Sequence, residues 1–443
     1  MLPGRYLHPA LTSLLFCALL SHPANLPAQT FWNQFRGPEG QAVSEKKLPV
    51  EFSETKNLRW KTAIDGRAWS SPVVWDNQVW VTNADPIQNP EGLSAFDVFP
   101  KELPPPADPP IRLSAVCLDL NTGKKIHDVT VFEVSHPQFV HETNSYASPT
   151  PVIEAGRIYV HYGAHGTACL DTKTGEKLWE RTDLKCHHFR GAGSSPIVFE
   201  DLLILTFDGF DRQFLTALDK TTGETVWLKE RDVAFENDFG DYHKAYATPQ
   251  IVTVDQKPLL ISPHANATSA YDPKTGELIW RIIHGGMNAA ARPVSGMGLV
   301  FVNAGDGRET MLALDPTGQG DVSDSHIRWR TGRMSPKRPS QVFYQEHLYL
   351  LEDKGVVACL DPQSGELLGN NRITGNYWAS PVIADGKIYA CSQEGKVSVI
   401  QANPELDVLA TNELDEGIIA SPAIAGEALL IRTKTHLYCI ASE

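Results

Sequence analysis

One phrase recurs along this chain of 443 residues. Its fullest copies are ALDKTTGETVW, which begins at Ala217, and AYDPKTGELIW, which begins at Ala270; CLDTKTGEKLW begins at Cys169. Further copies continue to the C-terminus, and some of them match the phrase only in part. The aspartate positions of successive copies lie 40 to 53 residues apart. This period is the length of one blade of a β-propeller, so the repeat constrains the fold before any single residue does.

Each repeat begins with a second phrase, such as SSPVVWDNQVWVT, SPTPVIEAGRIYVH or ASPVIADGKIYAC. Short β-branched and aromatic runs that are separated by turn residues predict antiparallel hairpins. We therefore expect four strands in each unit, A to D, with the D strand ending near a tryptophan. Eight copies of the second phrase predict eight units.

The two ends of the chain complement each other. The last unit, at 420–441, supplies only strands A to C, whereas NLRWKTAI at 57–64 reads as a D strand without A to C strands before it. Pairing the early strand with the last three closes the ring and removes its exposed edges. We predict an all-β protein: an eight-bladed β-propeller of four-stranded antiparallel blades at 58–443, with an insertion at 83–113 and an N-terminal extension at 29–57.

The repeat places a cysteine near an aspartate, which raises the alternative of a reactive thiol or a metal-ligand pair. Alanine replaces the cysteine at Ala217 and Ala270, which indicates a site for a small apolar residue instead. We expect the aspartate to hydrogen-bond the turn, the glycine to adopt a positive φ, and the tryptophan to be buried between blades. These structural residues are Asp171, Gly175, Trp179, Asp219, Gly223, Trp227, Asp272, Gly276 and Trp280.

Residues 1–28 have the pattern of a secretory signal peptide. Arg5 precedes the apolar run ALTSLLFCALL, which is too short to span a bilayer, and LPA at 26–28 suits cleavage. Phe16 is too bulky for the position before Cys17 in a lipoprotein signal, so we expect no lipid anchor. The net charge of −14 argues against nucleic acid as a partner. We expect an exported monomer, periplasmic or secreted, without a membrane span.

The pattern A-x-D-x-x-T-G-x-x-x-W at Ala217–Trp227 and Ala270–Trp280 resembles the tryptophan-docking repeat of pyrroloquinoline quinone (PQQ) propellers. That superfamily includes quinoprotein alcohol dehydrogenases and a non-enzymatic outer-membrane assembly lipoprotein. FWNQFRGPEGQAV at Phe31–Val43 is similar to the leader of exported bacterial PQQ-like repeat proteins. The resemblance implies the propeller fold, and it brings PQQ with Ca²⁺ into consideration as cofactors.

The chain departs from the dehydrogenases of this superfamily at their cofactor site. Eight-bladed members stack the quinone on a disulfide between adjacent cysteines, and this sequence has no adjacent cysteines. A Glu-Asn-Asp calcium set and a cytochrome segment are not matched either. The expectation is a binding or assembly scaffold, with a PQQ-dependent dehydrogenase of an alcohol or sugar as the alternative; no catalytic residue is assigned.

In a blade of four meandering strands, the D-to-A and B-to-C connections emerge on one face. These connections vary most between units, and variable loops on a rigid repeat scaffold usually carry function. The D-to-A connections also bring cationic and aromatic residues to the channel, including Tyr246, Lys337 and Arg338, and the B-to-C connections add Asp306 among others. We therefore expect a funnel that binds a protein partner or an anionic or hydroxyl-rich ligand; the alternative is a wet channel mouth filled by polar residues. The candidate ligand-binding residues are Arg67, Trp69, Asn144, Tyr146, His188, Arg190, His243, Asn288, Arg292, Arg333, Tyr377 and Trp378.

Histidines also gather in these connections. His187 and His188, with His141 or His243, suggest a metal site, but the spacing typical of metal ligands is absent. No metal site is predicted.

Overall fold

The computed structural model describes residues 31–85, 110–235, 239–308 and 310–442, together with Met1. The expected signal peptide at 1–28 and residues 86–109 of the expected insertion lie outside the described residues.

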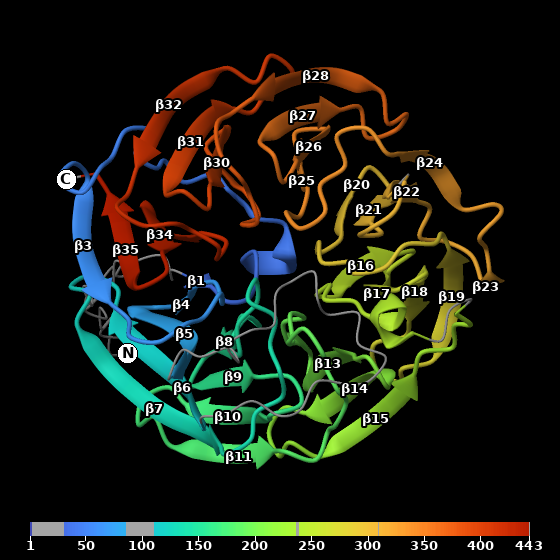
Figure 1. Ribbon diagram of the computed structural model, residues 1–443, viewed down its shortest axis with the longest axis horizontal. Helices are drawn as coiled ribbons and strands as arrows, with labels where there is room; N and C mark the ends of the chain where they lie inside the picture. The colour runs from blue at the N-terminus through green and yellow to red at the C-terminus, as the bar shows by residue number, and fades with distance from the viewer. Residues whose placement is uncertain (2–30, 86–109, 236–238, 309, 443) are drawn as a thin grey trace.

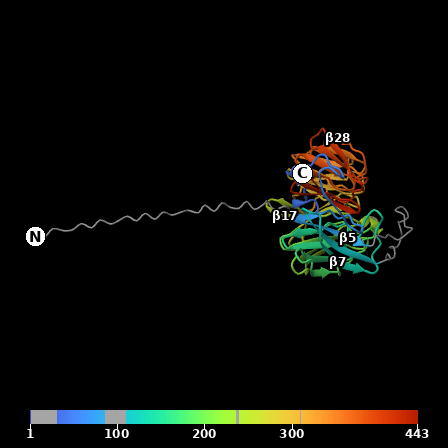
Figure 2. The same ribbon diagram turned by 90° about the vertical axis from the view of Figure 1, so that its left-hand side faces the viewer.

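Eight sheets follow one another around a ring (Figure 1). After a turn of 90° the ring is seen edge-on (Figure 2). Each sheet has a core of four antiparallel strands, which confirms the predicted eight-bladed β-propeller.

Blades are numbered here from the first one that is formed by consecutive strands. Blades 1 to 4 are formed by β4 (Val73–Trp75), β5 (Gln78–Asp85), β6 (Ile111–Asp119) and β7 (Lys125–Val134); β8 (Val152–Glu154), β9 (Arg157–His161), β10 (Thr167–Asp171) and β11 (Lys177–Arg181); β12 (Ile197–Phe199), β13 (Leu202–Asp208), β14 (Gln213–Asp219) and β15 (Thr225–Glu230); and β16 (Gln250–Val254), β17 (Lys257–His264), β18 (Ala267–Tyr271) and β19 (Leu278–Ile283). Blades 5 to 8 are formed by β20 (Val294–Gly296), β21 (Leu299–Asn303), β22 (Met311–Leu314) and β24 (Ile327–Thr331); β25 (Val342–Tyr344), β26 (His347–Leu351), β27 (Val356–Leu360) and β28 (Leu367–Arg372); β29 (Val382–Ala384), β30 (Lys387–Cys391), β31 (Lys396–Gln401) and β32 (Val408–Glu413); and β33 (Ala423–Ala425), β34 (Ala428–Arg432), β35 (His436–Ala441) and β3 (Leu58–Ala63). The short strand β23 (Gly320–Asp321) adds to β19.

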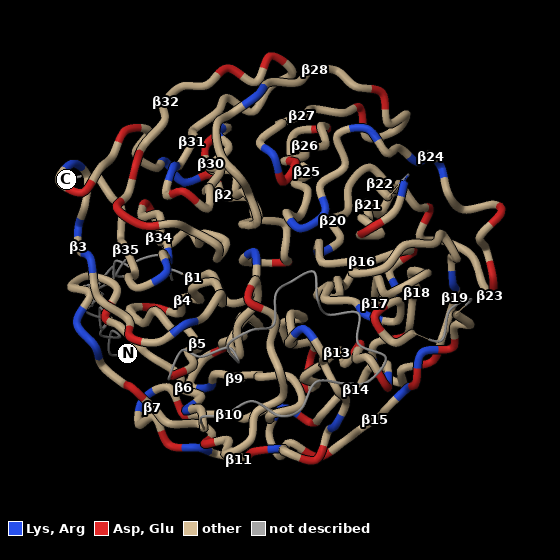
Figure 3. Tube along the Cα trace, in the orientation of Figure 1, with Lys and Arg blue, Asp and Glu red and all other residues tan. Residues whose placement is uncertain are grey.

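Strands B and C are buried on both faces because neighbouring blades cover them. In β14 the five residues from Phe214 to Leu218 are all buried. The outer strand β15 instead exposes Val226 and buries Trp227. Charged residues of both signs therefore lie along outer strands such as β7 and β15 (Figure 3).

The repeat residues join each blade to the next. In the turn after β10, Asp171 Oδ1 accepts hydrogen bonds from the backbone N–H groups of Lys173 and Thr174, both at 2.8 Å, and Gly175 has a φ of 76°. The aspartates Asp219 and Asp272 bond their turns in the same way, and Gly223 and Gly276 also have positive φ. A left-handed backbone is readily adopted only by glycine, which explains the repeated Thr-Gly pair.

The repeat tryptophans lie on the turns of the following blades. The indole N–H of each donates to the carbonyl that follows the turn aspartate of the next blade, at 2.8–3.1 Å: Trp60 to Leu120, Trp179 to Lys220, Trp227 to Pro273, Trp280 to Pro316 and Trp329 to Pro362. The ring also covers the turn glycine, since a Cβ at Gly223 would lie 2.8 Å from the Trp179 ring. The spacing of aspartate, glycine and tryptophan is thus set by contact between blades.

The surroundings of the described cysteines indicate a structural role. Cys117, Cys169, Cys186, Cys359, Cys391 and Cys439 are all free and buried. Burial raises the pKa of the Cys169 thiol to about 12, which keeps it protonated and unreactive near neutral pH.

The first and last strands of the propeller close the ring, as predicted. β3 pairs antiparallel with β35, and Trp60 lies opposite Cys439 in the register. Arg432 bridges the same junction from inside: its guanidinium donates to Ser70 Oγ at 2.9 Å and to the carbonyl of Thr82 at 2.8 Å. Blade 8 is therefore bonded to blade 1 as well as to the N-terminal strand.

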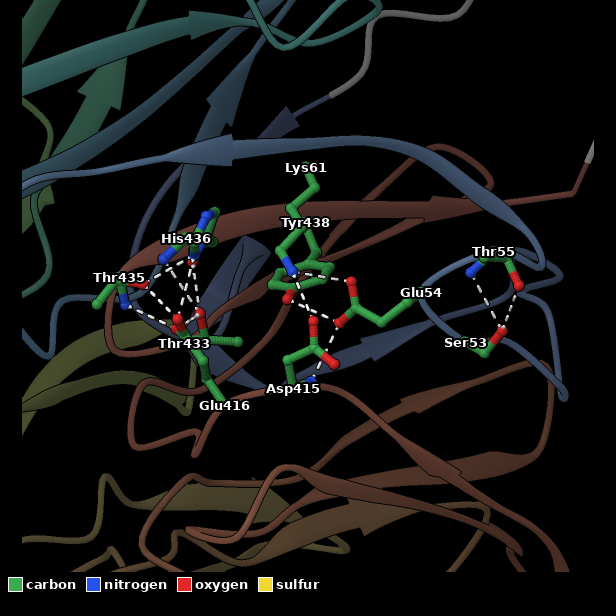
Figure 4. A network of polar contacts seen from close by, with 10 residues as sticks. All are labelled: Ser53, Glu54, Thr55, Lys61, Asp415, Glu416, Thr433, Thr435, His436 and Tyr438. Atoms are coloured by element: carbon green, nitrogen blue, oxygen red, sulfur yellow. Dashed lines mark hydrogen bonds and ion pairs between the residues drawn. The ribbon is translucent and has the colours of Figure 1, made fainter.

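A polar network on the outer side of this junction adds to the closure (Figure 4). Lys61 of β3 bonds Glu54 at 2.9 Å and Asp415 at 3.1 Å, and its ammonium lies over the ring of Tyr438. Tyr438 of β35 in turn donates to Glu54 at 2.9 Å. Ion pairs and a hydrogen bond thus join residues near the start of the propeller to residues of its last two blades.

The segment Phe31–Ser44, called the leader below, lies at the centre of the ring (Figure 1). Its strand β1 (Phe31–Trp32) pairs with β4, and its strand β2 (Val43–Ser44) pairs with β29, so blades 1 and 7, which lie on either side of blade 8, each gain an innermost strand. Between them the 3-10 helix η1 (Pro38–Gly40) contacts β16. The leader therefore crosses the channel between blades 1 and 7.

Candidate functional site

A pocket of about 300 Å³ lies where the D-to-A connections converge. Its residues come from blades all around the ring, and Phe35 of the leader also lines it. The strands of the leader pair with the A strands β4 and β29 themselves. Most of the other lining residues lie in the connections that come just before the A strands. Phe35 therefore lies on the side of the pocket that faces away from the loops and forms its floor.

Hydroxyl groups form the lower wall of the pocket. Each belongs to the Ser-Pro or Thr-Pro step, or its equivalent, that leads into a strand A. Except in Ser71, the hydroxyl oxygen accepts the backbone N–H of the matching residue in the preceding blade. Six such bonds of 2.9 Å are present: Ser71 to Thr150, Thr150 to Ser195, Ser195 to Thr248, Arg292 to Ser340, Ser340 to Ser380 and Ser380 to Ser421. All of these hydroxyl residues except Ser340 line the pocket, and we call the lining members Ser71, Thr150, Ser195, Thr248, Ser380 and Ser421 the hydroxyl ring.

Aromatic rings form part of the upper wall. Trp69, Tyr246 and Trp378 line the pocket. The guanidinium of Arg67 lies 5.2 Å from the centre of the Trp69 ring, and that of Arg338 lies 4.7 Å from the Trp378 ring. These cation–π contacts hold the rings in place at the mouth.

The cations of the pocket have acidic partners. Arg190 makes two bonds to Asp241, at 3.0 and 2.8 Å, and Lys337 pairs with Asp306 at 2.9 Å. Arg338 pairs with Asp353 at 2.9 Å. Burial alone lowers the pKa of Arg190, but the hydrogen bonds and charge of Asp241 outweigh it and raise that pKa. Each cation that lines the pocket is thus paired with an acidic side chain.

The candidate ligand-binding residues fall into two groups. The pocket brings five of them together: Trp69, Asn144, Arg190, Asn288 and Trp378. Arg67 stands behind Trp69, and its side chain bonds the carbonyl of Glu142.

The other six lie away from this pocket. Tyr146 and His188 line a small adjoining cavity, and His243 stacks on Phe235 with ring centres 4.0 Å apart. Tyr377 is fully buried and donates to the carbonyl of Thr374, while Arg333 is exposed.

Arg292, the sixth, lies at the centre of the ring and bonds the leader. It occupies the place that serine or threonine takes in most blades, and its guanidinium donates to the carbonyl of Phe35 and to Gln34 Oε1. Arg36 of the leader is also buried and bonds the carbonyls of Ser340 and Gln341. Burial lowers the pKa of both arginines to about 9, and in the case of Arg36 the charge of Arg292 adds to this effect.

Sequence reasoning missed the hydroxyl ring and Phe35. A signal for the ring was present, because serine or threonine precedes most of the innermost strands, usually before a proline. No comparable signal existed for Phe35, whose neighbour Arg36 bonds residues about 300 positions further along the chain.

The donor set of the pocket does not match a calcium site. Ca²⁺ takes six to eight oxygen ligands, usually with several carboxylates. Asp306 is the one carboxylate among the pocket's lining residues, and it already bonds Lys337 and Asn288. Over the described part of the chain, no group of three or more His, Cys, Asp or Glu side chains is placed to hold a metal.

Comparison with known proteins gives one family. A profile described as outer membrane protein assembly factor BamB matches residues 113–238 and 211–443. The BamB proteins of Legionella pneumophila (strain Paris) and Shewanella oneidensis are 24% identical over 221 residues and 22% identical over 260 residues. These matches cover 48% and 56% of this chain, and the chain spans only 51% and 60% of the two relatives.

Solved structures agree on the fold. The quinohemoprotein alcohol dehydrogenase from Comamonas testosteroni superimposes with a TM-score of 0.61 at 12% identity, over 93% of this chain and 81% of that one. BamB from Moraxella catarrhalis has a TM-score of 0.52 at 12% identity, over 76% of this chain and 96% of its own. At such identities the likeness shows a PQQ-like propeller fold. Among the described residues, no helix is long and apolar enough to cross a membrane.

Proposed function

Because this chain belongs to the family of the outer membrane protein assembly factor BamB, we propose that it is an exported scaffold that binds a partner or ligand in the pocket at the centre of its loop face. The name of the family connects its members with the assembly of outer membrane proteins, which supports a periplasmic location for this chain.

The single observation that carries the binding role is the pocket itself. It is a cavity of about 300 Å³ that is lined by two tryptophans and a tyrosine, with hydroxyl groups at its base. Concave sites of this size that combine aromatic walls with a few placed polar groups are typical of ligand-binding pockets. A channel mouth that was merely filled by polar side chains would not need such a cavity.

PQQ-dependent oxidation is the alternative that the structural likeness to alcohol dehydrogenases raises. The pocket offers a single engaged carboxylate where a calcium ion needs several. The six described cysteines are free, and none is adjacent to another. The residues present thus do not fit the Ca²⁺ ion of a PQQ site, and binding without oxidation is the function we favour.

Site-directed photocrosslinking tests this proposal in cells. A photoreactive residue in place of Trp378 should give a discrete adduct, because this side chain lines the pocket. The same residue in place of Tyr242 is the matched control, since Tyr242 is an exposed aromatic residue of a D-to-A connection outside the pocket. Trp69→Ala should weaken the adduct at position 378.

Identical adducts at both positions, or none at position 378, would contradict a binding role for the pocket. A second measurement distinguishes PQQ-dependent oxidation from binding without oxidation. Purified protein is incubated with PQQ and Ca²⁺, passed through gel filtration and examined for quinone absorbance and for dye-linked oxidation of alcohols and sugars. Retained quinone with oxidation would favour the dehydrogenase.

A further inference from the structure

The hydroxyl ring presents protons to the pocket. Ser71, Thr150, Ser195, Thr248 and Ser421 are all at least 93% buried, and each lines the cavity. Four of the oxygens accept a backbone N–H from the preceding blade: those of Thr150, Ser195, Thr248 and Ser421. Ser71 is the exception, because its hydroxyl accepts no such bond among the described residues.

The protons of these five hydroxyls have no acceptor within the described part of the chain. Ser380 differs from them, because its proton is directed to Ser340 Oγ at 3.1 Å. A buried hydroxyl that cannot donate loses a hydrogen bond that it would make in water. The pocket therefore has five polar groups at one level that a ligand atom can satisfy.

Two further hydrogen-bond donors above the hydroxyl ring also lack an acceptor among the described residues. The indole N–H of Trp69 is buried without a hydrogen-bond partner. Tyr246 also lines the cavity, and its hydroxyl makes no hydrogen bond to the described residues. The opposing acceptors are few: the unpartnered Oδ1 of Asn288, and the carboxylate of Asp306, which Lys337 and Asn288 already occupy. Unsatisfied donors thus outnumber unsatisfied acceptors.

Positive charge lies directly behind the floor. Arg292 donates to the carbonyl of Phe35, whose side chain lines the pocket, and the Nε of Arg292 has no partner. Arg36 lies at the same centre, and both guanidinium groups bond only carbonyl and amide oxygens. Within the described ranges no carboxylate pairs with either arginine, so their charge acts on whatever occupies the base of the pocket through an interior that screens it poorly.

From these observations we infer that the hydroxyl ring is a carboxylate-binding subsite, and that the pocket selects ligands that place a carboxylate on the ring and an apolar face against the tryptophans. This inference rests on the proposed binding function of the pocket. A planar monoanion suits the site better than a dianion, because the cations of the wall are already paired with Asp241, Asp306 and Asp353. Hydrogen bonds to a charged acceptor are the stronger kind, so several of them at one level can hold the anion.

Two pairs of small probes test the preference for a carboxylate. The first is the peptide acetyl-Ala-Ala-Phe with a free C-terminal carboxylate, against its C-terminal amide. The second is the methyl glycoside of galacturonic acid, which carries a single carboxylate, against its methyl ester. Binding to the full mature protein is measured by calorimetry. We expect the acid to bind at least ten-fold more tightly than its neutral form in one pair, and the pair that responds identifies the source of the carboxylate as a peptide end or a sugar acid.

Matched variants connect the preference to the ring. Thr248→Val removes a ring hydroxyl, and Ser340→Ala removes a hydroxyl that makes the same bond between blades but does not line the pocket. Loss of one charge-assisted bond should weaken the acid about ten-fold in Thr248→Val and leave the neutral probe unchanged. Ser340→Ala should bind both probes no more weakly than the wild type does, because it removes no hydroxyl from the pocket and only frees the proton of Ser380. Ser195→Ala is a second ring variant in case Thr248→Val does not fold.

Equal affinity for acid and neutral forms in both pairs would overturn the inference, and so would failure of both acids to bind at millimolar concentration. Equal loss of acid binding in Thr248→Val and Ser340→Ala would overturn it too, because it would assign the effect to the contact between blades. The crosslinking at position 378 decides the proposed function independently. A specific adduct there, combined with no preference for the acid, would leave the binding pocket standing and remove only the carboxylate subsite.

Discussion

The contact between Trp227 and Gly276 makes a quantitative test of how the blades are joined. Trp227 is 93% buried, and its indole donates to the carbonyl of Pro273 in the next blade at 3.1 Å. Gly276 lies under the ring with a φ of +68°, and a Cβ on it would lie 2.7 Å from Trp227 Cδ2. Alanine at this position therefore meets two separate penalties, one in the backbone and one against the ring.

The control for the backbone penalty is Gly156, which has a φ of +79° and open space where a Cβ would be added. Gly156→Ala should cost about 1 kcal/mol, because only the left-handed backbone resists the substitution. Gly276→Ala should cost about 2–4 kcal/mol, since overpacking adds roughly 1–3 kcal/mol. Trp227→Ala alone should cost about 3–5 kcal/mol for the lost ring.

The double variant separates the two penalties. Without the indole ring, Gly276→Ala should cost only about 1 kcal/mol, as Gly156→Ala does, which gives a coupling of roughly 1–3 kcal/mol between the two sites. Denaturant unfolding of the wild type, the three single variants and the double variant, followed by circular dichroism, measures these differences in the free energy of unfolding. If Gly276→Ala costs the same with and without Trp227, the tryptophan does not set the need for glycine, and the explanation of the repeat spacing fails.

Four further predictions follow from the fold and the chain ends. Cys169→Ala should cost about 1 kcal/mol, and native protein should resist thiol reagents because burial raises the pKa of this thiol to about 12; rapid labelling of folded protein would contradict this. Partial burial acts to raise the pKa of Glu416, but hydrogen bonds from Thr435 and Thr433 outweigh it and lower this pKa from 4.5 to about 2. The stability that the charged carboxylate contributes above pH 4.5 should therefore be lost as the pH falls towards 2. Acid unfolding of Glu416→Gln should lack this contribution. Removal of residues 29–64 should expose the edge of β35 and cause unfolding or aggregation, whereas a monomer with unchanged melting would refute the closure. Mass spectrometry of exported protein should find Gln29 or a close neighbour at the N-terminus, and retention of Met1 would argue against cleavage.

The fold was predictable because its determinants are local and repeated. Each blade carries its own turn aspartate and glycine, and the period of the repeat gives the number of blades. The closure was predictable as well, since an isolated D strand and an incomplete last unit have only each other as partners. These signals need no knowledge of distant contacts.

The site was only partly predictable, because neighbouring loop residues face opposite ways. Trp378 lines the pocket, whereas Tyr377, one position earlier, is fully buried in the core of its blade. Asn144 and Tyr146 lie in a turn-rich connection, where Asn144 lines the pocket and Tyr146, two positions later, faces a separate small cavity. Consecutive side chains of an extended segment point to opposite sides, so membership of a loop does not fix the direction of a side chain.

The leader explains why the centre of the ring departs from the repeat. In most blades the position before strand A carries serine or threonine, whose hydroxyl joins neighbouring blades, but Arg292 takes that position in blade 5. Its guanidinium lies against Gly40, where a Cβ would clash with it, and bonds the carbonyl of Phe35. Arginine at 292 and glycine at 40 thus fit each other, and neither is explained by its own blade. The same contact sets the floor of the pocket, so an altered leader should change ligand binding even where the eight blades remain folded.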